Sequence, residues 1–137
     1  MKRTLACLFI NFGILSLYAQ EDIQAGTIHF SAKEVNFGII ERDSDPFREI
    51  TITNLGNYPL IINSCRASCG CTVPNCPVEA IAPKKKSTIK IRYNTHNIGS
   101  FSKTITVYSN DQKNPISLIR IYGEVKDNTT AKQKSTP

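Results

Sequence analysis

The chain has 137 residues, 40% of them hydrophobic, and a formal net charge of +6 from 17 basic and 11 acidic residues. This length suits one small domain and leaves little room for a second. The basic residues are scattered, apart from Lys84, Lys85 and Lys86. Because a nucleic-acid site needs a broader basic stripe, the composition excludes nucleic acid as a partner.

Residues 1–19 have the order of a secretory signal peptide. Lys2 and Arg3 form a short positive segment, residues 5–17 are mostly apolar, and Ala19 provides a small residue at the expected cleavage point. The apolar stretch is too short for a spanning helix, which needs about 20 such residues. We therefore expect an exported protein, periplasmic or secreted, whose mature chain of 118 residues has no membrane span.

Apolar and polar residues alternate with a period of two along most of the remaining chain, which indicates strands. In chain order, the alternating apolar residues are Ile28 and Phe30; Val35, Phe37 and Ile39; Ile50 and Ile52; Ile89, Ile91 and Tyr93; and Phe101, Ile105 and Val107. The stretch Leu60–Ile62 is apolar on both faces, which predicts a central strand. A last strand is expected over Ile116–Val125, where a change of phase between Leu118 and Ile119 predicts a bulge.

Turn-forming residues separate these predicted strands. Clusters of Asn, Asp, Gly and Pro occur at residues 43–46, 54–57, 94–99 and 110–115. No segment after the signal peptide shows a convincing helical period. Between six and eight short strands with such spacing predict an all-β domain, either a sandwich or a barrel.

Four cysteines, Cys65, Cys69, Cys71 and Cys76, lie in a predicted edge loop with the spacing C-x3-C-x-C-x4-C. In an oxidising compartment an even number of cysteines favours two disulfides, for which three pairings are possible. One alternative is a zinc or copper site formed by all four thiolates. Another is redox chemistry at a strained, reducible Cys69–Cys71 pair. The spacing lacks the C-x2-C motifs of most zinc sites and thiol redox enzymes, so two disulfides are the preferred interpretation.

Other candidate functional residues are few. His29 lies in a predicted strand and His96 in a predicted turn, and we expect both to be exposed and without a ligand role. The sequence has no phosphate-binding loop, nucleophile elbow or paired metal motif. We therefore expect no catalytic residue, no cofactor and no enzymatic activity.

A series of short motifs resembles, in the same order, those of the DUF1573 family. They are Asn36-Phe37-Gly38, Ile52–Leu60, Ser68-Cys69-Gly70-Cys71-Thr72, Ile81-Ala82-Pro83, Tyr93-Asn94-Thr95, Gly99–Lys103 and Ser109-Asn110. The resemblance implies an exported protein of the type found in Bacteroidetes, with a fold similar to the immunoglobulin-like ASH and MSP domains and no established activity. The expected fold class is therefore all-β, an immunoglobulin-like β-sandwich of about seven strands preceded by a signal peptide. This DUF1573-type domain is expected over residues 25–126, and a disordered tail over residues 127–137.

Two features depart from the family pattern. The family usually has Gly where this chain has Lys84, so this turn is expected to differ. The family motif contains Cys69 and Cys71, whereas Cys65 and Cys76 resemble additions. The resemblance thus favours a Cys65–Cys76 bond and a separate role for the other two cysteines, with the crossed pairing still open.

A complete sandwich pattern without catalytic residues favours a non-enzymatic module that works in protein interaction or envelope structure. We expect its partner to be another envelope or surface protein, bound through loops or a sheet edge. The alternative is a thiol-based metal-binding or redox accessory protein that uses Cys69 and Cys71. The sequence leaves the oligomeric state open.

Overall fold

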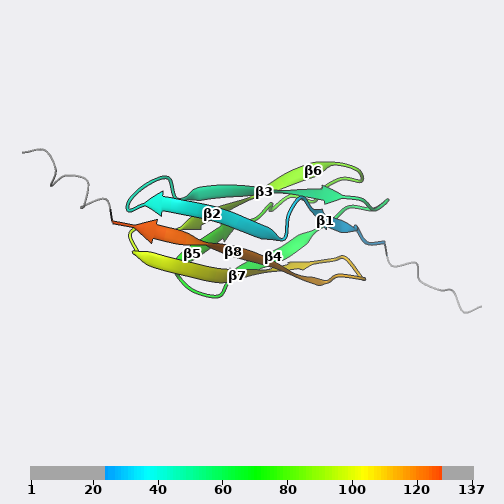
Figure 1. Cartoon of the computed structure of the whole chain (residues 1–137). Helices are drawn as coiled ribbons and strands as arrows, with labels where there is room; N and C mark the ends of the chain where they lie inside the picture. Colours follow the sequence, from blue (N-terminus) through cyan, green and yellow to red (C-terminus); the bar gives the residue numbers. More distant parts are fainter. Residues whose placement is uncertain (1–23, 128–137) are drawn as a thin grey trace, which may run out of the picture.

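The computed structural model describes residues 24–127 (Figure 1). This part of the chain contains eight strands: β1 (Ile28–Phe30), β2 (Glu34–Glu41), β3 (Phe47–Asn54), β4 (Ile62–Ala67), β5 (Thr72–Asn75), β6 (Lys86–Tyr93), β7 (Gly99–Ser109) and β8 (Ile116–Lys126). It includes no helix with the length and apolar character needed to cross a membrane. The predicted signal peptide, residues 1–19, and the predicted tail beyond Asp127 lie outside the described residues.

The strands form two four-stranded sheets that enclose one core. Sheet A has the strand order β1-β3-β6-β5, and sheet B has the order β2-β8-β7-β4. Neighbouring strands are antiparallel except for β2, which runs parallel to β8. The described chain begins beside β1 at one end of the sandwich and leaves after β8 at the opposite end (Figure 1). This all-β, immunoglobulin-like architecture confirms the predicted fold class.

The structure has one strand more than the seven expected, because the cysteine stretch is not simply a loop. Its first cysteine, Cys65, lies within β4, and β5 lies between Cys71 and Cys76. The strand β5 pairs with β6 at the edge of sheet A and contains Pro74. Proline is tolerated on an edge strand because its missing N–H need not pair there. Proline and the short length of β5 explain why the alternation signal was weak.

Branched aliphatic side chains from the inner faces of both sheets fill the core. The residues with no measurable exposure are Ile52, Leu60, Ile89, Ile91, Ile105, Val107, Ile119, Ile121 and Asn54. Three rings pack at the end of the core where β5 meets β6: Tyr93 stacks on Phe101 with centroids 3.7 Å apart, and Phe37 meets Phe101 edge-on at 5.5 Å. The period-two alternation predicted for β3, β6 and β7 therefore corresponds to burial against the opposite sheet.

Two predicted details of strand phase are wrong. The register of β2 against β8 shifts between Asn36 and Gly38, so Ile39 turns outward and is 67% exposed. The strand β8 has an unbroken register with β7, without the bulge predicted between Leu118 and Ile119. Leu118 simply faces outward while Ile119 is buried. In the sequence, an apolar residue on the outer face of a sheet therefore gives the same pattern as the change of phase that a bulge produces.

The composition of the apolar stretch Leu60–Ile62 predicted a central strand, and this prediction is wrong. Leu60 forms an isolated bridge with Ile81, and Ile62 begins β4 at the edge of sheet B. Leu60 and Ile62 are buried, whereas Ile61 between them is 44% exposed. The stretch therefore still alternates, and its apolar outward residue lies on the surface.

The turn before β6 keeps a backbone conformation that glycine adopts easily, although the chain has Lys84 there. Lys84 has φ +64°, in the left-handed region. Its backbone N–H donates to the Asn54 carbonyl at 2.9 Å, and its Nζ donates to the Leu55 carbonyl. These two contacts to the end of β3 hold a lysine in a conformation that is normally unfavourable for it.

Candidate functional site

The four cysteines lie where the chain passes from one sheet to the other. The strand β4 is the edge of sheet B, β5 is the edge of sheet A, and residues 68–71 connect them. Cys65 lies in β4, Cys69 and Cys71 lie in the connection, and Cys76 follows β5. All four side chains are partly buried, and Cys65, Cys71 and Cys76 pack against the core.

One disulfide joins Cys65 to Cys76 and so links the edges of the two sheets. Its Cα atoms are 6.3 Å apart, within the range that a disulfide spans without backbone movement. The sequence separation is 11 residues. In the chain-entropy model, closing a loop of this size stabilises the folded state by about 3 kcal/mol. This bond therefore has the position and the loop size of a structural cross-link.

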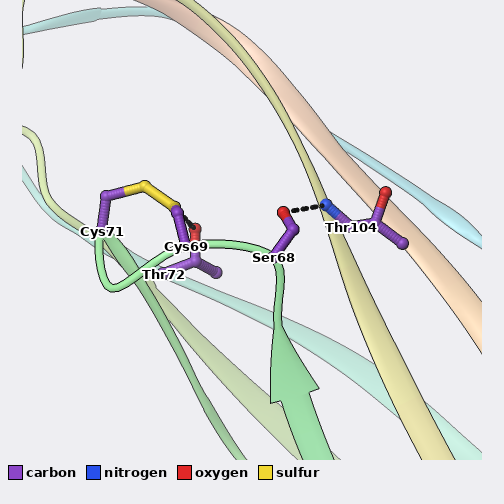
Figure 2. Close-up of a disulfide and its surroundings, with 5 residues drawn as sticks. All are labelled: Ser68, Cys69, Cys71, Thr72 and Thr104. Carbon is purple, nitrogen blue, oxygen red and sulfur yellow. Dashed lines mark hydrogen bonds between the residues drawn. A yellow bond between two sulfur atoms is a disulfide. The ribbon is translucent and has the colours of Figure 1, made fainter.

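The second disulfide joins Cys69 to Cys71 within the connection (Figure 2). Its Cα atoms are 5.3 Å apart, and Gly70 is the only residue enclosed by the bond. The chain-entropy model assigns only about 1.5 kcal/mol to so small a loop. The family resemblance favoured a Cys65–Cys76 bond and a separate role for Cys69 and Cys71; the structure has the Cys65–Cys76 bond and pairs the other two cysteines with each other.

Hydrogen bonds hold the connection independently of its disulfide. Ser68 N–H donates to the Thr104 carbonyl at 2.8 Å, and Thr104 N–H donates to Ser68 Oγ at 3.1 Å, a contact drawn in Figure 2. At the other end, Asn94 N–H donates to the Cys71 carbonyl at 2.8 Å. The loop is therefore anchored on both sides of the Cys69–Cys71 bond.

Thr72 lies beneath this bond and contacts both sulfurs. Its side chain is almost fully buried, and its Oγ1 is 3.8 Å from Cys69 Sγ and 3.9 Å from Cys71 Sγ. A sulfur in a disulfide has no hydrogen, so the threonine hydroxyl is the donor. Sequence reasoning assigned no role to Thr72, although it is the last residue of the Ser-Cys-Gly-Cys-Thr motif.

The metal-binding alternative is wrong for this form of the protein. All four sulfurs are in disulfide bonds and cannot act as thiolate ligands. Within residues 24–127, no group of three or more His, Cys, Asp or Glu side chains is arranged to hold a metal ion.

Both histidines are exposed, and neither lies in the cysteine region. His96 nevertheless has partners: its Nδ1 is 3.0 Å from Asp43 Oδ1, and its Nε2 is 3.0 Å from an Arg42 guanidinium nitrogen. Asp43 follows β2, and His96 lies between β6 and β7, so the contacts connect two turns that are far apart in sequence. The arrangement is that of a surface polar cluster.

A hollow of about 480 Å³ lies beside the Cys65–Cys76 bond. Both cysteines line it, with apolar surface from Ile61 and Val78 and polar surface from Asn63 and Ser64. Val78 is 94% exposed and Ile61 is 44% exposed, so both present apolar surface to solvent. The disulfide thus forms part of the wall of a concave site at the sandwich edge that has both apolar and polar surface.

Many solved structures are similar in fold, among them the following three. A protein of unknown function from Porphyromonas gingivalis W83 aligns with TM-score 0.66 and 19% identity over 80% of this chain and 51% of that one. The periplasmic chaperone SfaE aligns with TM-score 0.57 and 13% identity over 73% of this chain and 58% of that one. The ASH/PapD-like domain 7 of human CEP192 aligns with TM-score 0.57 and 12% identity over 73% of this chain and 85% of that domain. Identities this low establish the fold alone.

The chain spans about half the length of the Porphyromonas protein and somewhat more of the chaperone. No curated protein sequence matches it. The family model of DUF1573, described as a protein of unknown function, matches residues 28–125, which is most of the chain and confirms the resemblance in the short motifs. The chain therefore belongs to the DUF1573 family.

Proposed function

We propose that this protein is an exported, non-enzymatic module that binds another envelope or surface protein at the sandwich edge formed by β4 and β5. Export is supported by the predicted signal peptide and by the two disulfides, since disulfides persist in oxidising compartments such as the periplasm and the exterior. Protein binding is supported by the sandwich fold and by a surface that offers apolar contact area.

The observation that carries this proposal is the hollow at the β4–β5 edge. Val78 is almost fully exposed, although burying an aliphatic side chain of this size in an interface is favourable by about 1.5–3 kcal/mol. Concave apolar surface with polar groups around it is typical of binding sites. The Cys65–Cys76 bond holds two walls of the hollow together before binding, which lowers the entropy cost of association.

The other sheet edges offer less to a partner. The strands β1 and β5 have three and four residues, and β5 contains Pro74. The strand β2 has a register shift between Asn36 and Gly38, and β4 has one between Ile62 and Ser64. Short strands, prolines and bulges are devices that prevent pairing with another chain. Of the two longer edge strands, β2 and β4, only β4 borders the hollow, so we favour an extended segment of the partner that lies along β4 and places an apolar side chain in the hollow.

Site-specific photo-cross-linking in cells that export the protein tests this proposal. A photoreactive amino acid is placed at Val78, and the matched control carries it at Ile39, which is 67% exposed on β2 at the opposite edge of sheet B. We expect a discrete protein adduct from position 78 that disappears when Ile61→Asp is added, and no such adduct from position 39. Absence of an adduct at position 78, or the same adducts from both positions, would refute the proposal.

A further inference from the structure

We propose that Cys69–Cys71 is an exchangeable disulfide that reacts with dithiols of other exported proteins, whereas Cys65–Cys76 is a permanent cross-link. This assigns a stoichiometric thiol–disulfide exchange to a site outside the hollow, in addition to the proposed binding function. Four observations carry it: the size of the loop that the bond closes, the anchoring of that loop, the open approach at Gly70, and the position of Thr72.

Breaking the Cys69–Cys71 bond frees very little chain. The bond encloses only Gly70, and the loop stays attached to β7 through Ser68 and Thr104 and to the residue after β6 through the Cys71 carbonyl. The two thiols of the reduced form therefore remain close to each other in a folded protein. A site that keeps its geometry in both states can be reduced and reoxidised without unfolding.

An attacking thiolate has an open approach on the Gly70 side of the bond. Gly70 is exposed, and a Cβ atom built on it would meet no atom within 4 Å from any residue other than its neighbours Cys69 and Cys71. Cys69 and Cys71 are both partly exposed residues, and their sulfurs lie on the turn of the loop, as Figure 2 shows. Exposed or strained disulfides are the ones that exchange readily.

Thr72 supplies a hydrogen-bond donor to whichever sulfur leaves. Its Oγ1 is within 4 Å of both sulfurs, so the same hydroxyl serves attack at either cysteine. A hydrogen bond to a thiolate is charge-assisted and therefore stronger than one to a neutral disulfide sulfur. Stabilising the departing thiolate lowers the pKa of that thiol, and a thiol of lower pKa leaves faster.

The reaction conserves atoms and electrons. A thiolate of the partner attacks Sγ of one cysteine, the Cys69–Cys71 bond breaks, and its electron pair stays on the other sulfur beside Thr72. The second thiol of the partner loses its proton and attacks the partner's own sulfur in the mixed disulfide, so that the bond to this protein breaks and its electron pair stays on the cysteine sulfur. The partner gains a disulfide, and this protein gains two thiols with the two protons that the partner released. The reverse reaction with a protein disulfide donor of the same compartment restores the bond.

Equilibration with glutathione redox buffers tests the exchange directly. The folded protein is incubated over a series of reduced-to-oxidised glutathione ratios, its thiols are trapped by alkylation, and each cysteine is quantified by peptide mapping. We expect Cys69 and Cys71 to be half reduced at a lower ratio of reduced to oxidised glutathione than Cys65 and Cys76. The two ratios should differ by about tenfold or more. The circular dichroism of the sandwich should not change at that point.

Reduction of both disulfides together, of Cys65–Cys76 first, or of Cys69–Cys71 only on unfolding would overturn the proposal. A variant with Cys65→Ser and Cys76→Ser isolates the loop disulfide, provided that it stays folded. If it does not, the native protein still reports both pairs separately. Because the buffer contains no protein partner, failure of this experiment leaves the Val78 cross-linking result unaffected.

Substitution of Thr72 tests the role of its hydroxyl. Thr72→Val keeps the shape of the buried side chain, and Thr72→Ser keeps the hydroxyl. We expect Thr72→Val to slow reduction by glutathione about three- to tenfold and Thr72→Ser to restore most of the rate. Equal rates for all three proteins would refute the assigned role of Thr72, because a merely structural residue would change the melting temperature and not this rate.

Discussion

The two ends of the sandwich are held together by different chemistry. At one end, after β3 and before β8, the buried polar side chains of Asn54 and Asp111 connect separate loops. At the other end, where β4 passes to β5, the Cys69–Cys71 disulfide lies in the connection, and the Cys65–Cys76 disulfide joins β4 to the residue after β5. The first end depends on hydrogen bonds and charge, and the second depends on the redox state of the compartment.

Asn54 satisfies all of its side-chain hydrogen-bonding groups at the first end. Its Nδ2 donates to the Tyr58 and Ile81 carbonyls, both at 2.8 Å, and its Oδ1 accepts from Thr27 N–H at 3.2 Å and Gly56 N–H at 2.9 Å. One fully buried carboxamide thereby joins three segments of the chain. Satisfied buried polar groups of this kind fix loop geometry without a covalent bond.

Asp111 has a similar role with a negative charge. Its carboxylate accepts from Ile28 N–H at 2.9 Å, Lys113 N–H at 2.9 Å and Asn114 N–H at 3.2 Å, which attaches β1 to the connection between β7 and β8. Burial favours the neutral acid, but these hydrogen bonds together outweigh it and hold the pKa of Asp111 below its usual range. This end of the sandwich therefore responds to pH, whereas the disulfide end responds to reductant.

We expect the largest loss of stability from Asn54→Ala. The substitution removes four hydrogen bonds of a fully buried side chain, which corresponds to about 4 kcal/mol of unfolding free energy. Urea unfolding followed by circular dichroism measures it, with exposed Asn57→Ala as a control expected to change stability by less than about 0.5 kcal/mol. Similar losses in the two variants would show that the carboxamide does not hold this end together.

Replacing both Cys65 and Cys76 with Ser is expected to cost about 3 kcal/mol, because the unfolded chain regains the freedom of the larger loop. The same urea experiment measures the loss, with oxidised wild type as reference. Wild-type stability in this variant would mean that the link between the two sheets is redundant.

Asp111→Asn is expected to cost about 2 kcal/mol at neutral pH, since a charged acceptor of three backbone N–H groups becomes neutral. The folded-state pKa lies below the unfolded value of about 3.9, so the charge stabilises the fold above that pH, and this stability is lost as the pH falls through the folded pKa. Urea unfolding between pH 7 and pH 2 should give a difference between wild type and variant that is constant down to about pH 5 and shrinks below pH 4. A difference independent of pH would contradict this.

Replacing both Cys69 and Cys71 with Ser is expected to have the smallest effect, about 1.5 kcal/mol, because the loop they close is minimal and stays anchored by hydrogen bonds. Thermal unfolding of this double variant beside that of Cys65→Ser with Cys76→Ser compares the two disulfides directly. A loss as large as that of the second variant would make the loop disulfide a structural cross-link as well.

Local patterns predicted the strands whose side chains alternate between core and solvent. Ile50 and Ile52 in β3, and Ile89 and Ile91 in β6, follow that rule in the structure. The rule failed where the direction of a side chain depends on the neighbouring strand, because a local pattern carries no information about that strand. The outward positions of Ile39 and Leu118 depend on the register of β2 and β7 against β8, which is set by residues about eighty and ten positions away in sequence.

The candidate site was only partly predictable for the same reason. The spacing of the four cysteines indicated disulfides, and the Ser-Cys-Gly-Cys-Thr motif singled out Cys69 and Cys71. The hollow beside Cys65–Cys76 was not foreseen, because its walls come from the start of β4 and from the segment after β5.

The sequence by itself determined the fold class, the family and the chemistry available to the cysteine loop, because alternation and spacing are properties of neighbouring residues. Only the tertiary structure decided that Cys65–Cys76 joins two sheets, that Thr72 lies beneath the second disulfide, and that Asn54 connects loops at the opposite end. The physical reason is that these contacts depend on which strands pair and which sheet edges meet. Those pairings are selected by burial of the whole core and not by local preference.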